Sequence, residues 1–342
     1  MASLTCPLAL QRYHQVLLAH GGGGRLMHQL IQEMFLATFQ PEPAWQHDAA
    51  SLTVQGDRLA FTTDSYVVTP LFFPGGDIGS LAVHGTVNDL AMAGAKPCYL
   101  SLSLILEEGL PIDTLWRVVQ SIQAAAERAQ VRIVTGDTKG VDRGKGDGLF
   151  INTSGIGILE HDTWIGPSAV QPGDQILVSG DVGRHGIAIL SAREGLAFET
   201  AIESDSAPVA DRVQALLSQV PIHCLRDLTR GGLASALNEI ALAAEVSMDL
   251  ASGQIPVQAE VQGACELLGL DPLYVANEGR FVAFVPASAA DTALACLRQS
   301  HASAQVIGTV VKRGSAQVTL QSSTGSRRIL DLLSGEQLPR IC

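Results

Sequence analysis

Three apolar segments of this chain, each of which predicts a β-strand, run directly into an aspartate. The aspartates are Asp64 at the end of LAFTTD, Asp137 at the end of VRIVTGD and Asp227 at the end of CLRD. Carboxylates at strand ends converge on one edge of a sheet, so this recurrence predicts an acidic site at that edge. Carboxylate oxygens there can hold Mg²⁺ against the phosphates of a substrate. Any one of these acids taken alone is more often a turn or cap residue.

A fourth acidic position lies in a segment with helical character, expected from Ser80 to Ala95. This segment contains His84, Asn88 and Asp89, and the spacing of four places His84 and Asn88 on one helical face. We expect Asn88 and Asp89 to join the acidic site. For His84, a buried and hydrogen-bonded structural role is the competing interpretation.

The remaining patterns predict a mixed fold in which strands often come in pairs without a crossover helix, which is typical of α+β proteins. The segment 131–135 predicts a buried strand that ends at Gly136 and Asp137, followed by a glycine-rich charged loop over 139–148. Further helices are expected over 112–129, 186–194, 208–218, 231–244 and 287–299, and further strands over 98–106, 149–159, 175–179, 273–276, 281–285, 304–311 and 317–321.

The length of 342 residues suggests about two domains. A turn-rich segment over 167–174 marks the boundary, so we expect a first domain over 46–165 and a second over 166–333. A glycine-rich segment and helix over 1–45 precede them, and a flexible tail over 334–342 follows.

Two glycine-containing segments lead into predicted helices. Gly21–Gly24 forms a run of four glycines, for which a plain hinge and an anion-binding loop are both consistent with the sequence. The segment RDLTRGG contains Arg226 and Arg230 and enters a helix through Gly231 and Gly232. Because helix N-termini attract negative charge, this second segment is a candidate anion site.

Two charged residues are further candidates for chemistry. Lys139 lies two residues beyond Asp137, which suits phosphate binding or proton transfer, although most charges of its loop are expected to be solvated. Glu278, in VANEGRF, is expected at a turn between two strands, where an ordinary hairpin residue is the alternative.

Composition excludes several classes of protein. With 22 basic and 34 acidic residues the net charge is −12, so no basic surplus exists to neutralise nucleic acid or an anionic membrane. No run of apolar residues reaches the roughly 18 of a membrane span, and the N-terminal residues do not resemble a targeting signal. The six cysteines are scattered, as is ordinary in a reducing compartment, and we expect a cytoplasmic protein.

The chain ends on a cysteine, Cys342. A thiol on a flexible arm can move between sites, which suits a covalent carrier. Its reactive form is the thiolate, which the neighbouring Arg340 favours and the terminal carboxylate opposes.

Six segments, taken together, carry a family resemblance. They are TTDSYVVTPLFFPGGDIG, VHGTVNDLAMAGAKP, IVTGDTKGVDRGKGDG, CLRDLTRGGLASALNEIA, VANEGR and the terminal PRIC. The set resembles the HypE family of hydrogenase-maturation carbamoyl dehydratases. The TTD, ND, GDT, DLTRGG and NEG elements are similar to those of the wider superfamily of aminoimidazole ribonucleotide synthetase, selenophosphate synthetase and thiamine-monophosphate kinase, which imply ATP use. The terminal PRIC distinguishes HypE.

The resemblance implies a two-domain PurM-like fold, with an N-terminal α/β domain that forms a homodimer through a β-barrel and a second α/β domain behind it. ATP and Mg²⁺ are implied in the cleft between them. It implies that HypF, a carbamoyltransferase, loads a carbamoyl group onto the terminal cysteine, and that ATP-dependent dehydration turns this thiocarboxamide into a thiocyanate. The cyano group is then implied to pass to iron on the HypC–HypD complex, as a ligand for [NiFe]-hydrogenase.

Carried onto this sequence, the resemblance assigns site residues. Those implied to hold Mg²⁺ and phosphate are Asp64, Asp89 and Asp137, with Asn88, Gly136 and Asp227 as further cofactor-binding residues and Asp48 as a weaker candidate. Those implied in catalysis are Cys342, Lys139, Glu278 and His84. The loop of Gly21–Gly24 is implied to close over the nucleotide.

Two alternatives remain open at this point. The chain could be another ATP-using member of the superfamily, although selenophosphate synthetase is disfavoured because its glycine-rich loop carries a reactive Cys or Sec and a Lys, whereas here Arg25 follows only glycines. It could instead be a non-catalytic carrier whose tail docks in a partner. The several acids and Lys139 argue against a carrier, which does not need them.

Overall fold

The computed structural model describes residues 24–30, 32, 50–54, 57–195, 202–333, 338 and 341. The predicted site residues Cys342 and Asp48, and the glycines Gly21 to Gly23, lie outside these described residues.

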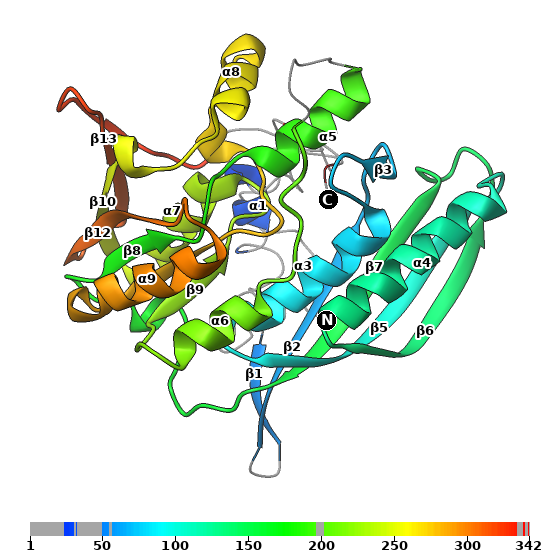
Figure 1. Cartoon of the computed structure of the whole chain (residues 1–342), viewed down its shortest axis with the longest axis horizontal. Helices are drawn as coiled ribbons and strands as arrows, with labels where there is room; N and C mark the ends of the chain where they lie inside the picture. Colours follow the sequence, from blue (N-terminus) through cyan, green and yellow to red (C-terminus); the bar gives the residue numbers. More distant parts are fainter. Residues whose placement is uncertain are drawn as a thin grey trace, which may run out of the picture.

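The first half of the described chain is a sheet with helices on one face. Its strand order is β1-β2-β7-β5-β6, in which β5 and β6 are parallel and the other neighbours antiparallel. Helices α3 and α4 lie side by side on the same face of this sheet (Figure 1). The strands and helices are β1 (Ala50–Val54), β2 (Asp57–Tyr66), α3 (Ile78–Met92), β5 (Lys96–Glu107), α4 (Ile112–Arg128), β6 (Arg132–Val141) and β7 (Leu149–Ile158), preceded by α1 (Arg25–Leu30), with a small hairpin of β3 (Phe72–Phe73) and β4 (Gly76–Asp77).

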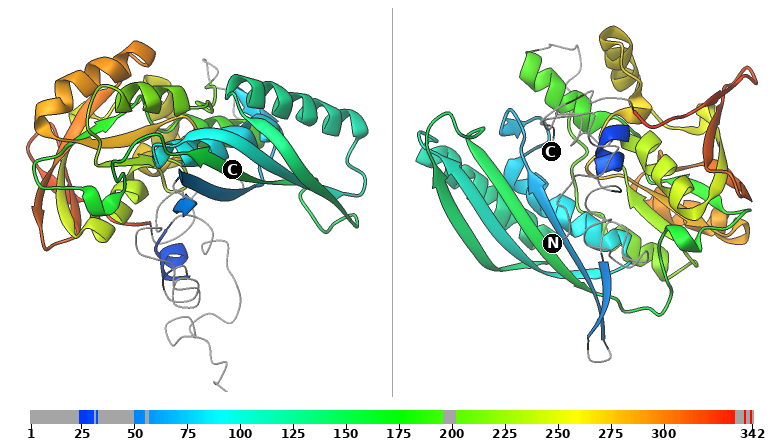
Figure 2. Two further views of the ribbon diagram at one scale, coloured as in Figure 1. Left: turned by 90° about the horizontal axis from the view of Figure 1, so that it is seen from below. Right: turned by 180° about the vertical axis from the view of Figure 1, so that it is seen from behind.

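The second half is built on a longer mixed sheet in the order β14-β13-β10-β12-β8-β11-β9. Figure 2 shows the two sheets as separate layers at opposite sides of the molecule. The strands are β8 (Gln175–Val178), β9 (Cys224–Asp227), β10 (Val246–Ala251), β11 (Phe281–Val285), β12 (Gln305–Arg313), β13 (Gln317–Gln321) and β14 (Arg327–Ile329). The helices are α5 (Arg184–Glu194), α6 (Ala210–Leu217), α7 (Gly232–Ala244), α8 (Ala259–Leu268) and α9 (Ala290–Ser300).

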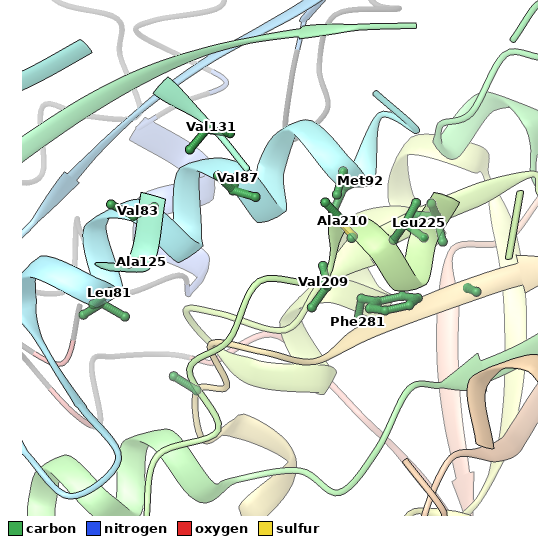
Figure 3. Packing of buried hydrophobic residues seen from close by; sticks show 14 of the residues in the cluster. Leu81, Val83, Val87, Met92, Ala125, Val131, Val209, Ala210, Leu225 and Phe281 are labelled. Carbon is green, nitrogen blue, oxygen red and sulfur yellow. The ribbon is translucent and has the colours of Figure 1, made fainter. Parts of the chain in front are cut away.

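Helix α3 joins the two halves, because nearly all of its side chains are buried. A helix that is apolar all round belongs inside a protein. It begins at Asp77, whose carboxylate accepts hydrogen bonds from the backbone N–H groups of Gly79 and Ser80. One continuous core runs from α3 and α4 to the second half (Figure 3), where Met92 lies near Ala210 and Leu225.

Asn88 on α3 connects this helix to the second half by hydrogen bonds. Its Nδ2 donates to the carbonyl oxygens of Ala207 and Glu278, both at 3.1 Å, and its Oδ1 accepts from the N–H of Val209 at 2.8 Å. A buried amide that is fully paired in this way fixes the relative position of the segments it joins.

The α+β architecture is confirmed, and three details differ from the sequence prediction. Residues 273–276 do not form a strand; Pro272–Tyr274 is a 3-10 turn, because Pro272 starts the turn and the Asp271 carboxylate accepts from the N–H of Leu273. Helix α8, strands β1, β10 and β14, and the β3–β4 hairpin were not predicted. No described helix is long and apolar enough to cross a membrane.

The third difference concerns β6, which was predicted as a buried strand ending before Lys139. It continues to Val141, so Gly136, Asp137 and Lys139 lie within it, and it is exposed along nearly its whole length. Among the described strands β6 lies at the edge of the sheet and pairs with β5 alone, so less of the protein covers it.

We expect Asn88→Ala to lower the free energy of unfolding by about 2–5 kcal/mol, since three buried backbone groups lose their partner. Urea denaturation followed by circular dichroism measures this. Gln123→Ala, on the exposed face of α4, is the control and should change stability by less than about 0.5 kcal/mol. Equal stability of the Asn88→Ala variant and the parent would contradict the bridging role.

Candidate active site

A pocket lies where the first sheet, α3 and the start of α7 meet. Its walls come from β2, from α3, from the β9–α7 connection and from the loop before β11. The lining residues are Thr62, Thr63, Asp64, Gly85, Asp89, Arg226, Asp227, Thr229, Arg230, Gly232, Ala236, Glu239 and Glu278. Four predicted site residues, Asp64, Asp89, Asp227 and Glu278, therefore share one pocket.

The acidic wall is formed by β2 and α3. Asp64 lies near the end of β2, and Asp89 accepts a hydrogen bond from the Thr62 hydroxyl at 2.9 Å. Gly85 lets α3 approach the sheet, because a Cβ there would lie 2.3 Å from the hydroxyl oxygen of Tyr66. Asp64 and Asp89 thus reach the pocket from β2 and α3. These two elements pack closely because Gly85 has no side chain.

The opposite wall carries cations and the start of a helix. Arg226 is hydrogen-bonded to Glu239, and the Arg230 guanidinium lies 3.8 Å from the Asp64 carboxylate. Helix α7 begins at Gly232, which has a φ of +60° and leaves no room for a Cβ, since the carbonyl oxygen of Val275 would lie 2.7 Å from it. The predicted anion site at this N-terminus lies in the pocket, where arginines and helix dipole together suit phosphate groups.

Glu278 is the buried acid of the pocket, with 3% of its surface exposed. Its pKa is raised well above the ordinary value, first by burial and then by the negative charges of Asp227, Asp205 and Asp64. One carboxyl oxygen, Oε1, has no hydrogen-bond partner among the described residues. A buried acid with a raised pKa and a free oxygen is suited to exchange a proton with a bound group.

Asp205 holds the backbone of the Glu278 loop. Its carboxylate accepts hydrogen bonds from the N–H groups of Glu278 and Gly279 at 3.0–3.3 Å. Behind this loop, the buried Arg280 guanidinium donates to the Asp181 carboxylate at 2.8 Å. The predicted hairpin position of Glu278 is wrong: the preceding turn is 3-10, and the hydrogen bonds to Asp205 fix the backbone of its loop instead.

His84 and Asn88 lie on α3 but are not among the pocket-lining residues. His84 is buried, its Nδ1 lies 3.0 Å from the Ser206 hydroxyl, and burial lowers its pKa to about 4, with the Arg128 charge acting in the same direction. All described polar atoms of the Asn88 amide are engaged with the backbone of the second half.

Asp137 and Lys139 lie on the opposite face of the first sheet from Asp64. They pair with Ser103 and Ile105 of β5 and therefore share the outer face, whereas Asp64 faces α3. Two strands, β7 and β5, separate β2 from β6, a distance of about 14 Å. Within one chain these residues do not meet the pocket carboxylates. Gly136 faces inward, where a Cβ would lie 2.2 Å from the carbonyl oxygen of Leu102.

The pocket fits a nucleotide with Mg²⁺ better than it fits a cation alone. No group of three described His, Cys, Asp or Glu side chains converges tightly enough to hold a metal ion. Mg²⁺, however, is commonly bound by one or two carboxylates and completed by substrate phosphates and water. Asp64 and Asp89, facing arginines across the pocket, meet that requirement.

Sequence reasoning missed two contributors to this site. Glu239 lies on the same face of α7 as Gly232 and Ala236, and this spacing of four and then three residues was a usable signal. Asp205 gave no local signal, because its role depends on a loop more than seventy residues away in the chain.

The raised pKa of Glu278 makes the stability of the protein depend on pH. An acid whose pKa is higher in the folded state stabilises the fold below its unfolded pKa, about 4.3, and this contribution is lost as pH rises towards the folded value. We expect Glu278→Gln, without nucleotide or metal, to melt at a higher temperature than the parent at pH 8 and to match it near pH 4. Differential scanning calorimetry measures this, with the exposed Glu160→Gln as the control for net charge. A difference that does not vary with pH would contradict the assignment.

The chain matches two family models over most of its length. They are AIR synthase related protein, N-terminal domain, over residues 46–159 and AIR synthase related protein, C-terminal domain, over residues 171–321. The expected two-domain PurM-like fold is therefore confirmed.

Relatives with established names match nearly end to end. The carbamoyl dehydratase HypE of Azotobacter vinelandii is 51% identical over 97% of this chain and 98% of its own length. That of Escherichia coli is 46% identical over 96% and 100%. A solved structure of the hydrogenase maturation protein HypE in complex with ATP aligns with a TM-score of 0.81 and 48% identity, over 96% of this chain and 100% of that one.

A HypE–HypF complex contains a chain that aligns with a TM-score of 0.83 and 44% identity, covering 89% of this chain and 99% of that one. The sequence identity to these relatives is near one half over almost the whole length, and both domain models match. The relationship is therefore close. The chain belongs to the HypE family of carbamoyl dehydratases.

Proposed function

We propose that this chain uses ATP to dehydrate a carbamoyl group, carried as a thiocarboxamide on Cys342, to a thiocyanate. The observation that carries the proposal is the docked end of the chain. Ile341, to which Cys342 is bonded, forms an antiparallel bridge with Val68, two residues beyond the end of β2. Asp64 of the same segment lines the pocket, so Ile341 lies beside the segment that leads into it. The ATP complex of a similar structure supports the choice of nucleotide.

The chemistry requires activation of a poor leaving group. The amide oxygen of the thiocarboxamide attacks the γ-phosphorus of ATP and ADP leaves, so that the oxygen departs from carbon as phosphate. Removal of both N–H protons forms the C≡N bond. The balance is one thiocarboxamide and one ATP in, and one thiocyanate, ADP, hydrogen phosphate and one proton out.

The residues of the pocket divide these tasks by their charge. We assign Asp64 and Asp89 to Mg²⁺, which when bound neutralises charge on the transferring phosphoryl group. Arg226, Arg230 and the N-terminus of α7 bind phosphate oxygens. Glu278 takes a proton from the amide nitrogen, because burial and the neighbouring acids raise its pKa and so make its carboxylate a stronger base.

We propose that Asp137 and Lys139 act in the pocket of a second copy of the chain. Figure 2 shows the outer face of the first sheet from behind. This face carries exposed apolar side chains that a homodimer would cover; they are Phe61, Tyr99, Ile105, Ile156 and Ile158. Lys139 shares that face with Ile105. A homodimer in which two such sheets close into a barrel would bring these residues within reach of the partner's pocket.

The protein partners follow from the same chemistry. A carbamoyl donor must load the tail, and the HypE–HypF complex supports HypF in that role. We propose the iron-carrying HypC–HypD complex as the acceptor of the cyano group, all in the cytoplasm.

The function is tested by the intact mass of the carbamoylated chain after ATP and Mg²⁺ are added. We expect loss of one water from the tail peptide in the parent. Glu278→Gln should bind ATP but retain the carbamoyl adduct, Asp89→Asn should raise the Mg²⁺ requirement or stop the reaction, and Cys342→Ala should never acquire the adduct. An adduct that is unchanged in the parent would instead indicate a non-catalytic carrier.

The shared site is tested by mixing two inactive variants, Lys139→Ala and Glu278→Gln, after dissociation and reassembly. If Lys139 acts in the partner's pocket, each mixed dimer contains one intact site, and random pairing restores roughly one quarter of the parental dehydration rate. If Lys139 acts in its own chain, mixing restores nothing.

A further inference from the structure

A buried histidine outside the pocket holds the end of the chain. His185, in the first turn of α5, is fully buried, and its Nε2 lies 2.6 Å from the carbonyl oxygen of Ile341. Its Nδ1 lies 2.7 Å from the hydroxyl oxygen of Ser204. A carbonyl oxygen only accepts hydrogen bonds, so Nε2 carries the proton and Nδ1 accepts from the serine.

Packing fixes the imidazole in this orientation. The ring of Phe73 meets it edge to face, with centroids 5.6 Å apart and planes at 87°. Burial lowers the pKa of His185, which keeps the ring neutral, while the Ile341 carbonyl and the Asp205 charge act in the opposite direction. A neutral ring locked in one tautomer is a fixed donor for a backbone carbonyl.

The docked tail has a second contact on the same helix. A Cβ on Gly186 would lie 3.0 Å from the Cδ1 of Leu338, so α5 has no side chain where Leu338 packs. Ile341 itself is buried, with 7% of its surface exposed, and pairs with Val68. The side chains of Leu338 and Ile341 and the carbonyl group of Ile341 thus hold these two residues against the protein.

The segment 204–206 joins this histidine to the pocket. Ser204 donates to His185 and also accepts from the N–H of Ser206. The next residue, Asp205, accepts from the backbone of Glu278. Ser204, which bonds the histidine that holds the tail, is therefore adjacent in the chain to Asp205, which holds the backbone of Glu278.

We propose that His185 is a positioning residue, which anchors the C-terminal tail through the carbonyl oxygen of Ile341 while the group on Cys342 reacts. The proposal rests on the function proposed above. A substrate attached to a tethered tail reacts in proportion to the time that the tail spends docked, so loss of the anchor lowers the rate without removing any reacting group. The anchor acts on the backbone, and His185 touches neither ATP nor the carbamoyl group.

The test compares His185→Phe, which keeps a ring but removes the donor, with His185→Gln, whose amide N–H can replace Nε2. The first measurement is the single-turnover dehydration rate of the pre-carbamoylated chain with saturating ATP. Loss of one hydrogen bond corresponds to a fall of roughly three- to tenfold for His185→Phe. We expect His185→Gln to recover most of the parental rate and the ATP affinity of both variants to equal that of the parent.

The second measurement does not depend on catalysis. The alkylation rate of Cys342 by iodoacetamide, followed on the C-terminal peptide by mass spectrometry, should rise by a similar factor in His185→Phe and return towards the parental value in His185→Gln. If the parent itself fails to dehydrate the tail, the proposed function fails, while the alkylation rates still test the anchor. Unchanged alkylation in His185→Phe overturns the anchor, as do equal changes in both variants accompanied by a lower melting temperature.

Discussion

The burial of α3 on all sides is the constraint on which the rest of this structure depends. A helix enclosed in this way can carry polar side chains only if each finds a partner in the surrounding chain. Asn88 finds its partners in the second half, and Asp89 faces the pocket between the halves. Helix α3, which joins the two halves, therefore also defines the position of the site. Any shift of one half against the other would leave buried polar groups without hydrogen-bond partners.

The charges of the site are arranged around a space that favours phosphate. Acids from β2 and α3 face Arg226 of β9 and Arg230 of the β9–α7 connection, and Glu278 lies buried beside the acids. Arg230, 3.8 Å from the Asp64 carboxylate, offsets part of this negative charge, and a divalent cation would offset more of it. The overall acidity of the chain, which argues against general nucleic-acid binding, is thus compatible with a nucleotide as substrate.

Local sequence patterns predicted most of the helices and strands and some of the residues that line the pocket. Strands that end in an acid located Asp64 and Asp227, and the RDLTRGG segment located the helix N-terminus beside them. Local pattern could not locate Asp137 and Lys139, because which face of a strand a residue occupies depends on register, and a bulge between Leu100 and Ser101 sets it. Nor could it reveal Asp205 or His185, whose partners are distant in sequence. The edge position of β6 is likewise a property of strand order rather than of composition.

The contact between His185 and Ile341 involves a main-chain oxygen, and this has a consequence for how the end of the chain can vary. A carbonyl group is the same in every residue, so the histidine recognises how far along the tail a peptide unit lies and not which side chain it bears. Any apolar residue of similar size would satisfy the small buried space at position 341. An inserted residue between positions 341 and 342 would leave the anchor intact and still carry the thiol away from where it is needed. The length of the last few residues is therefore under a stricter constraint than their identity.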